Sequence, residues 1–215
     1  MTEHGILLDH EREQRLGFDE AIYAAGKSVQ QVEALVADAV EARHRRLFTR
    51  LDAFKYEALG ASARSALDFD PVSRTAFVGE RRRACDAGIA IVSGGSSDLP
   101  VCREVGRTLE YYGRASLLVS DVGVAGIWRL LARIEELRAM RVVVVVAGME
   151  GALPSVVGGL VRGVVIAVPT SIGYGVSEGG RVALESALAS CAPGLLTVNI
   201  DNGYGAACAA LRIVG

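Results

Sequence analysis

Three carboxylates in the second half of the chain have the setting of catalytic or ligand-binding residues. Asp98, Asp121 and Glu150 each come shortly after an apolar run and stand in a glycine-containing loop, in the strings SGGSSD, SDVG and AGMEG. Carboxylates in such loops can act as a general base or bind Mg²⁺. Each is equally suited to a structural role at a helix N-terminus. The residues alone therefore leave both interpretations open.

The SGGSSD loop (93–98) has the composition of a phosphate-binding turn. Its glycines allow close approach of the backbone, and the free N–H groups of a following helix suit an anion. An ordinary turn with Ser97 or Asp98 as the N-cap explains the same residues. The sequence contains neither a GxGxxG fingerprint nor a Walker lysine at this loop, so the two common nucleotide motifs do not apply.

Histidine and cysteine narrow the chemistry further. All three histidines, His4, His10 and His44, precede the apolar half, which excludes a histidine base within that half. The four cysteines form no CxxC pair and, without a secretion signal, are expected to be reduced thiols. Cys191, in the string SCAPG, is by residue type a small buried hydrophobe. A catalyst in this half is therefore a carboxylate, thiol, hydroxyl or phenol, or a group donated by the front segment.

Strands and helices alternate in the apolar half. Five apolar, largely β-branched runs lack polar alternation, as strands buried on both faces do, at Ile89–Val92, Ser116–Val119, Val142–Val146, Val164–Val168 and Leu195–Ile200. Helical patterns separate or follow them, at Leu99–Tyr112, Ala125–Met140, Leu153–Val161, Glu178–Ser190 and Ala206–Ile213. This order predicts an α/β fold, a three-layer open parallel sheet with right-handed crossovers. Ligands bind at the carboxyl ends of such strands, so the polar loops are expected to converge on one rim.

The 215 residues divide in composition near Asp86. The first 86 residues carry 28 of the 48 charged side chains, and 20 of the 25 glycines lie after them. We expect a charged, mainly helical N-terminal segment over 1–86 and a parallel α/β domain over 87–215. Within the front segment, Ser28–Leu47 has apolar residues at helical spacing, with Ser28 as the N-cap.

Net charge and hydropathy exclude several classes of partner. A formal charge of −2 gives no reason to expect nucleic acid or an anionic membrane surface. The longest apolar run, Val142 to Met149, is far shorter than the roughly 20 residues that span a bilayer. The N-terminus lacks the basic and apolar pattern of a secretory signal, so a cytoplasmic location is expected.

Seven strings, taken in order, resemble one protein family: DHEREQRLGFDE, AAGK, DVGVAGIWRLL, VVAGMEGALPSVVGGL, IAVPTSIGYG, SCAPG and VNIDNGYGA. The sequence is similar to the pyridinium-3,5-biscarboxylic acid mononucleotide synthase (LarB) family, which acts in making the nickel-pincer cofactor of lactate racemase. The resemblance runs from about Asp9 to the C-terminus. This family is related to phosphoribosylaminoimidazole carboxylase, and its known fold is the same open parallel sheet in a homo-oligomer, typically an octamer.

The resemblance implies carboxylation of nicotinic acid adenine dinucleotide at C5 of the pyridine ring, then hydrolysis of its phosphoanhydride with release of AMP. CO2 or bicarbonate is the implied cosubstrate and Mg²⁺ the implied cofactor, with its ligands unassigned. By the family's motifs, Cys191 is the nucleophile that adds to the ring and Glu150 accepts the C5 proton. Substrate-binding roles are implied for Ser96, Ser97, Asp98, Asp121, Arg12, Arg15 and Lys27.

Two competing hypotheses stay open. The same fold and SSD loop fit a phosphoribosylaminoimidazole carboxylase or mutase, although Trp128 stands where that enzyme's catalytic histidine is expected. A non-catalytic nucleotide-binding oligomer is the second alternative. The strand pattern also places Cys191 before the last strand, opposite the loop rim. It reaches a rim only through an irregular helix end or from another subunit.

Overall fold

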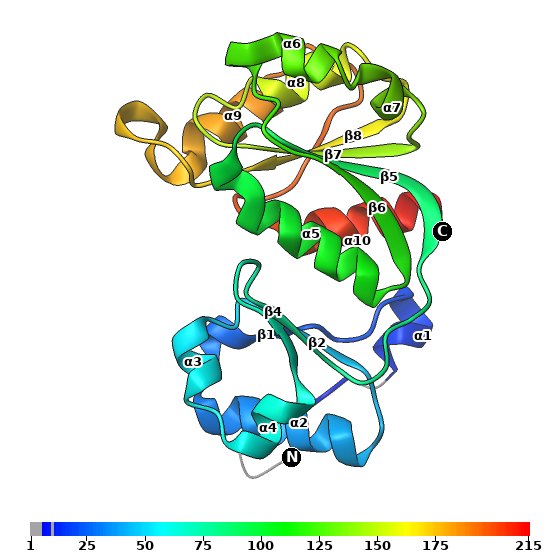
Figure 1. Cartoon of the computed structure of the whole chain (residues 1–215), viewed down its shortest axis with the longest axis vertical. Helices are drawn as coiled ribbons and strands as arrows, with labels where there is room; N and C mark the ends of the chain where they lie inside the picture. The colour runs from blue at the N-terminus through cyan, green and yellow to red at the C-terminus, as the bar shows by residue number, and fades with distance from the viewer. Residues whose placement is uncertain (1–5, 10) are drawn as a thin grey trace. The chain divides into compact units, whose positions relative to one another are not determined.

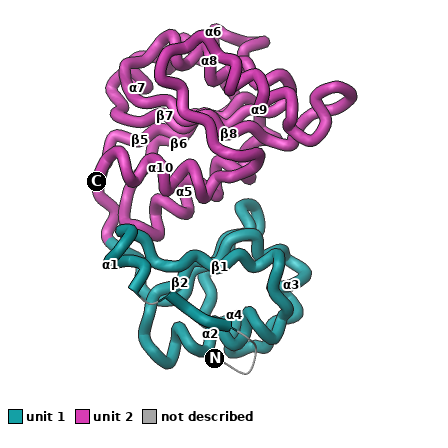
Figure 2. The backbone as a smooth tube through the Cα atoms, turned by 180° about the vertical axis from the view of Figure 1, so that it is seen from behind, with its two compact units in different colours: residues 1–82 teal, residues 83–215 magenta. Residues whose placement is uncertain are grey.

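The structure is a computed structural model that describes residues 6–9 and 11–215. The chain divides into two compact units, residues 1–82 (unit 1) and residues 83–215 (unit 2), shown in two colours in Figure 2. The division between the units falls after Arg82, four residues before the change in composition near Asp86. The first strand of unit 2 begins at Cys85, ahead of the apolar run at Ile89.

Unit 1 carries a small sheet that the sequence analysis did not predict. Its helices are α1 (Arg12–Leu16), η1 (Ala24–Gly26), α2 (Val29–Glu41), α3 (Ala53–Glu57) and α4 (Ala61–Ala66). Its strands are β1 (Ile22–Tyr23), β2 (Arg46–Thr49), β3 (Asp68–Asp70) and β4 (Thr75–Val78). They lie in the order β1-β2-β4-β3, with β1 parallel to β2 and the other pairs antiparallel.

The helix expected over Ser28–Leu47 is shorter than predicted. Ser28 caps α2 as expected: its Oγ accepts a 3.1 Å hydrogen bond from the Gln31 N–H, and Gln31 Oε1 accepts one from the Ser28 N–H at 3.0 Å. The helix nevertheless ends at Glu41, and Leu47 belongs to strand β2. Arg43 has a φ of 53°, a left-handed backbone conformation that turns the chain out of the helix.

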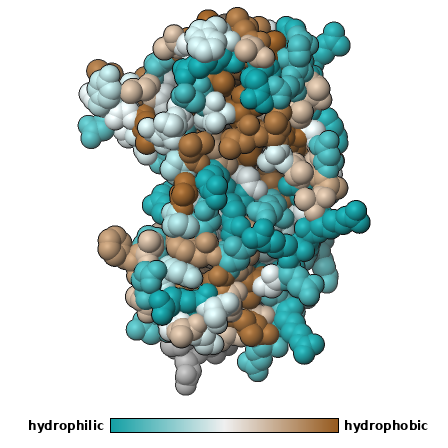
Figure 3. Space-filling model, viewed as in Figure 1, coloured by the Kyte–Doolittle hydropathy of each residue, from teal (hydrophilic) through white to brown (hydrophobic). Residues whose placement is uncertain are grey.

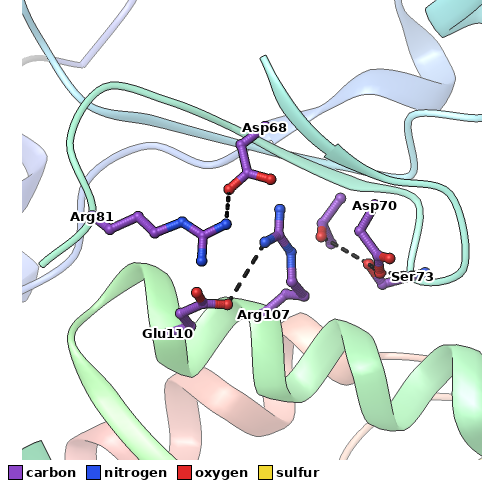
Figure 4. A network of polar contacts seen from close by, with 7 residues as sticks. Asp68, Asp70, Ser73, Arg81, Arg107 and Glu110 are labelled. Atoms are coloured by element: carbon purple, nitrogen blue, oxygen red, sulfur yellow. Dashed lines mark hydrogen bonds and ion pairs between the residues drawn. The ribbon is translucent and has the colours of Figure 1, made fainter. Parts of the chain in front are cut away.

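Side chains stabilise the turn between β3 and β4 of unit 1. The Asp70 carboxylate accepts a hydrogen bond from the Ser73 N–H at 3.0 Å and another from its hydroxyl. Figure 4 shows Asp70 beside Ser73. The Ser73 hydroxyl also lies 2.8 Å from Thr75 Oγ1. All three residues are buried, so the turn satisfies its polar groups internally.

Unit 2 contains the predicted five-stranded parallel sheet. Its strands are β5 (Cys85–Ser93), β6 (Arg114–Val119), β7 (Val142–Ala147), β8 (Val164–Pro169) and β9 (Leu196–Thr197). They lie in the order β6-β5-β7-β8-β9, and every neighbouring pair is parallel. All six residues of β7 are buried, as expected for a central strand covered on both faces. Strand β9 is shorter than the run Leu195–Ile200 suggested.

Helices cover both faces of this sheet, which confirms the three-layer α/β fold. Helices α5 (Leu99–Tyr111) and α10 (Gly203–Val214) pack together on one face. The other face is covered by α6 (Ile127–Leu131), α7 (Ile134–Arg138), α8 (Leu153–Gly158) and α9 (Arg181–Leu188), as Figure 1 shows. The single helix predicted over Ala125–Met140 is thus two short ones, interrupted at Ala132–Arg133. Among the described residues, no helix is both long and apolar enough to cross a membrane.

Candidate functional site

A cavity of about 290 Å³ lies at the carboxyl ends of the central strands of unit 2. The loops after β5, β6, β7 and β8 all contribute to its wall, as the sequence pattern predicted. The lining residues are Gly94, Gly95, Ser97, Asp98, Gly123, Val124, Ala125, Arg129, Ala147, Gly148, Met149, Glu150, Ala152, Leu153 and Ile172. The two predicted carboxylates Asp98 and Glu150 are therefore brought to one cavity.

Asp98 is the buried carboxylate of this cavity. It is 4% exposed. Its Oδ2 accepts a hydrogen bond from the Gly95 N–H at 2.9 Å, and its Oδ1 accepts one from the Thr170 hydroxyl at 2.7 Å. Burial raises the pKa of this carboxyl above its usual value, although the Thr170 and Gly95 hydrogen bonds act in the opposite direction. Both oxygens are thus held by the protein, which favours a fixed wall residue over a mobile base.

Glu150 is the exposed carboxylate of the cavity, and a tight turn presents it. The Gly151 N–H donates to the Gly148 carbonyl at 3.0 Å, and the Met149 N–H donates to the Ile172 carbonyl at 2.7 Å. Met149 takes a φ of 54° to make this turn. A side chain at Gly148 would bring its Cβ to 2.2 Å from the Ile172 carbonyl oxygen, so only glycine fits there. The Glu150 side chain consequently stands on a rigid support with its carboxylate open to the cavity.

Asp121 and Arg129 form an ion pair at the β6 side of the cavity. Asp121 does not itself line the cavity, but its Oδ2 accepts a 2.6 Å hydrogen bond from Nη1 of Arg129, which does. The Asp121 N–H donates to Ser93 Oγ at 3.0 Å, and its φ is 59°. The sequence analysis missed Arg129. The signal that could have found it is that Arg129 is the first charged residue after Asp121 along the chain.

The two serines of the SSD string separate in the structure. Ser97 lines the cavity and Ser96 does not, although both are exposed. Gly95 and Asp98 close a short 3₁₀ turn over Ser96–Asp98, and α5 follows directly. The loop therefore brings one hydroxyl and the start of a helix to the cavity wall, an arrangement that suits an anionic group.

Cys191 does not line this cavity. It is exposed and lies between α9 and β9, beside α8. Its neighbours fix that place: Ser190 Oγ is 2.7 Å from Ser155 Oγ, and a Cβ at Gly158 would meet Ala192. Of the other cysteines, Cys102 is fully buried, and burial raises the pKa of its thiol to about 12, so it cannot supply a thiolate. Within one chain, the predicted nucleophile and the predicted base are not brought together.

Three predicted substrate-binding residues, Arg12, Arg15 and Lys27, belong to unit 1, and none of them lines the cavity of unit 2. Arg15 is committed to Asp9, with hydrogen bonds of 3.0 and 2.6 Å between its guanidinium and that carboxylate. This pairing keeps the pKa of Asp9 below its usual value. The substrate-binding roles of Arg12, Arg15 and Lys27 stay a prediction.

The described residues do not form a preorganised magnesium site. Over residues 6–9 and 11–215, no group of three or more histidine, cysteine or acidic side chains is placed to hold a metal ion. The two oxygens of Asp98 accept hydrogen bonds from Thr170 and Gly95, and Asp121 is paired with Arg129. The Mg²⁺ implied by the family resemblance stays a prediction.

Comparison with known proteins agrees with the division into two units. Residues 4–80 match the family model described as LarB/PurE-like N-terminal domain, and residues 88–215 match the one described as AIR carboxylase. An uncharacterized protein of Methanocaldococcus jannaschii is 34% identical, over 95% of this chain and 82% of its own. Two crystal structures of Treponema denticola PurE proteins, one of them a point variant, are similar to 58% of this chain at 24% identity and a TM-score of 0.49. The similarity covers 77% and 78% of those chains.

Proposed function

This chain belongs to the LarB family, which is related to the AIR carboxylases, and is therefore a carboxylase-type enzyme. We propose which specific reaction it catalyses. It converts nicotinic acid adenine dinucleotide, CO2 and water into pyridinium-3,5-biscarboxylic acid mononucleotide and AMP. The product is the precursor of a nickel-pincer cofactor. The family supports the carboxylase class; the substrate, the covalent step and the hydrolysis are our proposal.

One observation carries the proposal: the cavity of unit 2 is lined by an exposed carboxylate and by no imidazole. All three histidines of the chain precede residue 83, so a base within residues 83–215 is not histidine. Glu150 is exposed on a rigid turn at the cavity, whereas both oxygens of Asp98 are held by hydrogen bonds. A carboxylate within reach of a carbon acid can act as the general base. This supports Glu150 as the group that takes the ring proton.

The chemistry requires a nucleophile as well as a base. A pyridinium C5 is electron-poor and does not attack CO2. Addition of the Cys191 thiolate to C4 forms an S–C bond and leaves an enamine whose C5 is nucleophilic. C5 then bonds to CO2, Glu150 takes the C5 proton, and the electron pair of that C–H bond expels the thiolate and restores the ring. Water next attacks the phosphoanhydride, one P–O bond breaks, and AMP leaves.

Cys191 is proposed to act in the cavity of a neighbouring copy. Within one chain it lies beside α8 and outside the lining of the cavity that holds Glu150. Unit 2 also exposes large apolar side chains that a neighbouring copy would cover, among them Trp128, Tyr174, Val176 and Leu188. Figure 3 shows hydrophobic residues reaching the surface of this unit among hydrophilic ones. These features support a homo-oligomer in which each site is completed by a neighbouring copy. The family resemblance implies that this oligomer is an octamer.

The test is a mass-spectrometric assay of the full chain with nicotinic acid adenine dinucleotide, bicarbonate and Mg²⁺. The expected products are AMP and a mononucleotide that carries one additional carboxylate. AMP without carboxylation would contradict the covalent step. An unchanged dinucleotide, with the protein folded, would contradict the enzymatic proposal and favour a nucleotide-binding protein.

Variants separate the two catalytic roles in that assay. Cys191→Ala is expected to abolish carboxylation, and Glu150→Gln to lower turnover by roughly 10²–10⁴-fold, the usual contribution of a general base. Glu135→Gln is the matched control, because Glu135 pairs with Arg138 on the surface helix α7 and does not line the cavity. Full activity of Cys191→Ala would rule out the thiolate mechanism.

A further inference from the structure

The outer side of helix α6 exposes an apolar patch beside the cavity of unit 2. Its members are exposed and lie within eight consecutive residues, and they are called the α6 patch below: Ala125, Ile127, Trp128, Leu131 and Ala132. Trp128 is 71% exposed. Ala125 also lines the cavity, so the patch begins at the cavity rim. Large apolar side chains gathered on one surface mark an interaction site.

The loop after β8 carries a second exposed apolar surface. This loop, residues 173–180, is called the arm below and includes the short 3₁₀ segment η4 (Gly175–Gly180). Figures 1 and 2 both show it standing out from the rest of unit 2, next to α9. Tyr174 is 77% exposed and Val176 is 90% exposed. The preceding residue, Ile172, lines the cavity, so the arm also starts at the cavity rim.

Contacts of its own backbone hold the arm in this position. The Ser177 N–H donates a 3.1 Å hydrogen bond to the Tyr174 carbonyl and closes a turn near the tip. At the foot of the arm, Gly180 is buried and has a φ of 79°. A Cβ at Gly180 would lie 2.5 Å from the Thr170 carbonyl oxygen, so the foot is packed tightly against the end of β8. The arm therefore presents its two large apolar side chains to the outside from a fixed support.

A second copy of this chain is the partner that these two surfaces fit. The reaction proposed above needs a thiol, and Cys191 does not line the cavity of its own chain, so a neighbouring copy must stand at the mouth of that cavity. Residues 87–215 carry ten basic and ten acidic side chains, so copies of this region do not repel one another through net charge. Two different surfaces that meet head to tail can close a ring in which each copy gives one arm and receives one.

We propose that the arm of one copy docks on the α6 patch of a neighbouring copy, with Trp128 as the anchor of the contact. Tryptophan and tyrosine dominate the binding energy of many interfaces because their large rings are removed from water. The arm leads through α9 to Cys191 in the same chain, so the contact brings the copy that carries the thiol to its neighbour's cavity. The choice of a second copy as partner rests on the proposed function, whereas the contact itself is measured without any reaction.

Trp128 is the sole tryptophan of the chain, so its fluorescence reports on the contact directly. In the full wild-type chain we expect emission at the short wavelengths of a covered indole, weak quenching by acrylamide, and the mass of an oligomer in light scattering. The double variant Tyr174→Ser, Val176→Ser should move the emission to longer wavelength. It should also weaken association roughly 30-fold or more, the loss typical of an interface hot spot.

Phe54→Ser is the matched control, because Phe54 is an aromatic residue that is 92% exposed on α3 of unit 1. It should change neither the emission nor the mass. Circular dichroism checks that each variant is folded, which is expected because all the replaced side chains are exposed.

Emission of a water-exposed indole in the wild-type chain would overturn the proposal. A double variant that keeps both the wild-type emission and the wild-type mass would overturn it too, even if Trp128→Ser dissociates the oligomer, because the α6 patch would then meet another surface. The proposed reaction fails separately from the contact. An arm-dependent emission together with an unchanged dinucleotide would support the contact and contradict the enzyme, whereas turnover with an exposed Trp128 would do the reverse.

Discussion

The Thr170 hydroxyl donates a 2.7 Å hydrogen bond to the Asp98 carboxylate, and both residues are buried. The bond joins the carboxyl end of β8 to the loop after β5, on two strands that are separated in the sheet by β7. Together with the Gly95 N–H it leaves Asp98 with two fixed oxygens. The cavity therefore pairs a carboxylate that is locked in its wall with one, Glu150, that is exposed, and environment assigns them different roles.

Burial of Asp98 makes a prediction about pH and stability. Its pKa lies above the ordinary 3.8 because burial penalises the charged form. The folded protein then keeps this proton where the unfolded chain has lost it, so the contribution of Asp98 to stability is full below the unfolded pKa and is lost as pH rises through the folded pKa. The difference in free energy of unfolding between the wild-type chain and Asp98→Asn should accordingly fall as pH rises from about 4.

Urea unfolding at a series of pH values measures this difference. Thr170→Val provides the second variant, because it removes a hydrogen bond that lowers the pKa of Asp98. In that variant the pKa of Asp98 should rise further, so the stabilising contribution of Asp98 should be lost at a higher pH than in the wild-type chain. A difference that stays constant with pH would show that the carboxyl is not perturbed in solution.

The turn that carries Glu150 should be intolerant of a side chain at Gly148. A Cβ there would lie 2.2 Å from the Ile172 carbonyl oxygen and 2.6 Å from Thr170 Oγ1. We expect Gly148→Ala to lower the free energy of unfolding by about 1–3 kcal/mol or more, the cost of overpacking. Gly159→Ala is the control, because its Cβ would meet nothing closer than 3.6 Å and its φ is −80°. Equal stability of the two variants in denaturant titrations would contradict this account of the turn.

Arg129 is expected to contribute to substrate binding. It lines the cavity and offers the remaining N–H groups of a guanidinium that is oriented by Asp121. Arg129→Gln should raise KM roughly tenfold or more through the loss of a charge-assisted hydrogen bond, with a smaller effect on kcat. Arg133→Gln is the comparison, since Arg133 is paired with Glu136 on the surface. Similar kinetics of the two variants would remove Arg129 from the site.

Mixing of two inactive variants tests whether the site forms between copies. Chains with Cys191→Ala and chains with Glu150→Gln each lack one catalytic group. If Cys191 serves the cavity of a neighbour, mixed oligomers regain roughly a quarter of the wild-type sites, because each site draws its two groups from different chains. Co-expression of the two variants and assay of the purified mixture measures this recovery. A mixture as inactive as its components, with mixed oligomers demonstrated by mass spectrometry, would place both groups in one chain.

The sequence predicted most of unit 2, for a clear physical reason. The strands of a parallel sheet are buried on both faces, so each appears as an uninterrupted apolar run such as Val142–Val146, which the structure places in β7. The carboxyl ends of parallel strands meet at one edge. The sequence alone therefore implies that the loops that hold Asp98 and Glu150 converge.

Unit 1 was predicted less well because its strands carry no comparable signal. β1 and β2 have two and four residues, and Ile22 pairs with Phe48 far along the chain. Such pairing depends on tertiary packing more than on local propensity. The turn at Arg43 was not predicted either. The helical pattern of the sequence continues to Leu47, whereas the helix itself ends at Glu41 and Arg43 takes a left-handed backbone conformation.

The sequence by itself determined the fold class, the rim of polar loops and the absence of histidine from unit 2. It could do so because burial patterns and residue types are local properties. Only the tertiary structure decided which carboxylate is locked and which is exposed, that Arg129 lines the cavity, and that Cys191 lies outside it. Those outcomes depend on hydrogen bonds and contacts between loops that follow different strands. No spacing along one chain specifies such contacts.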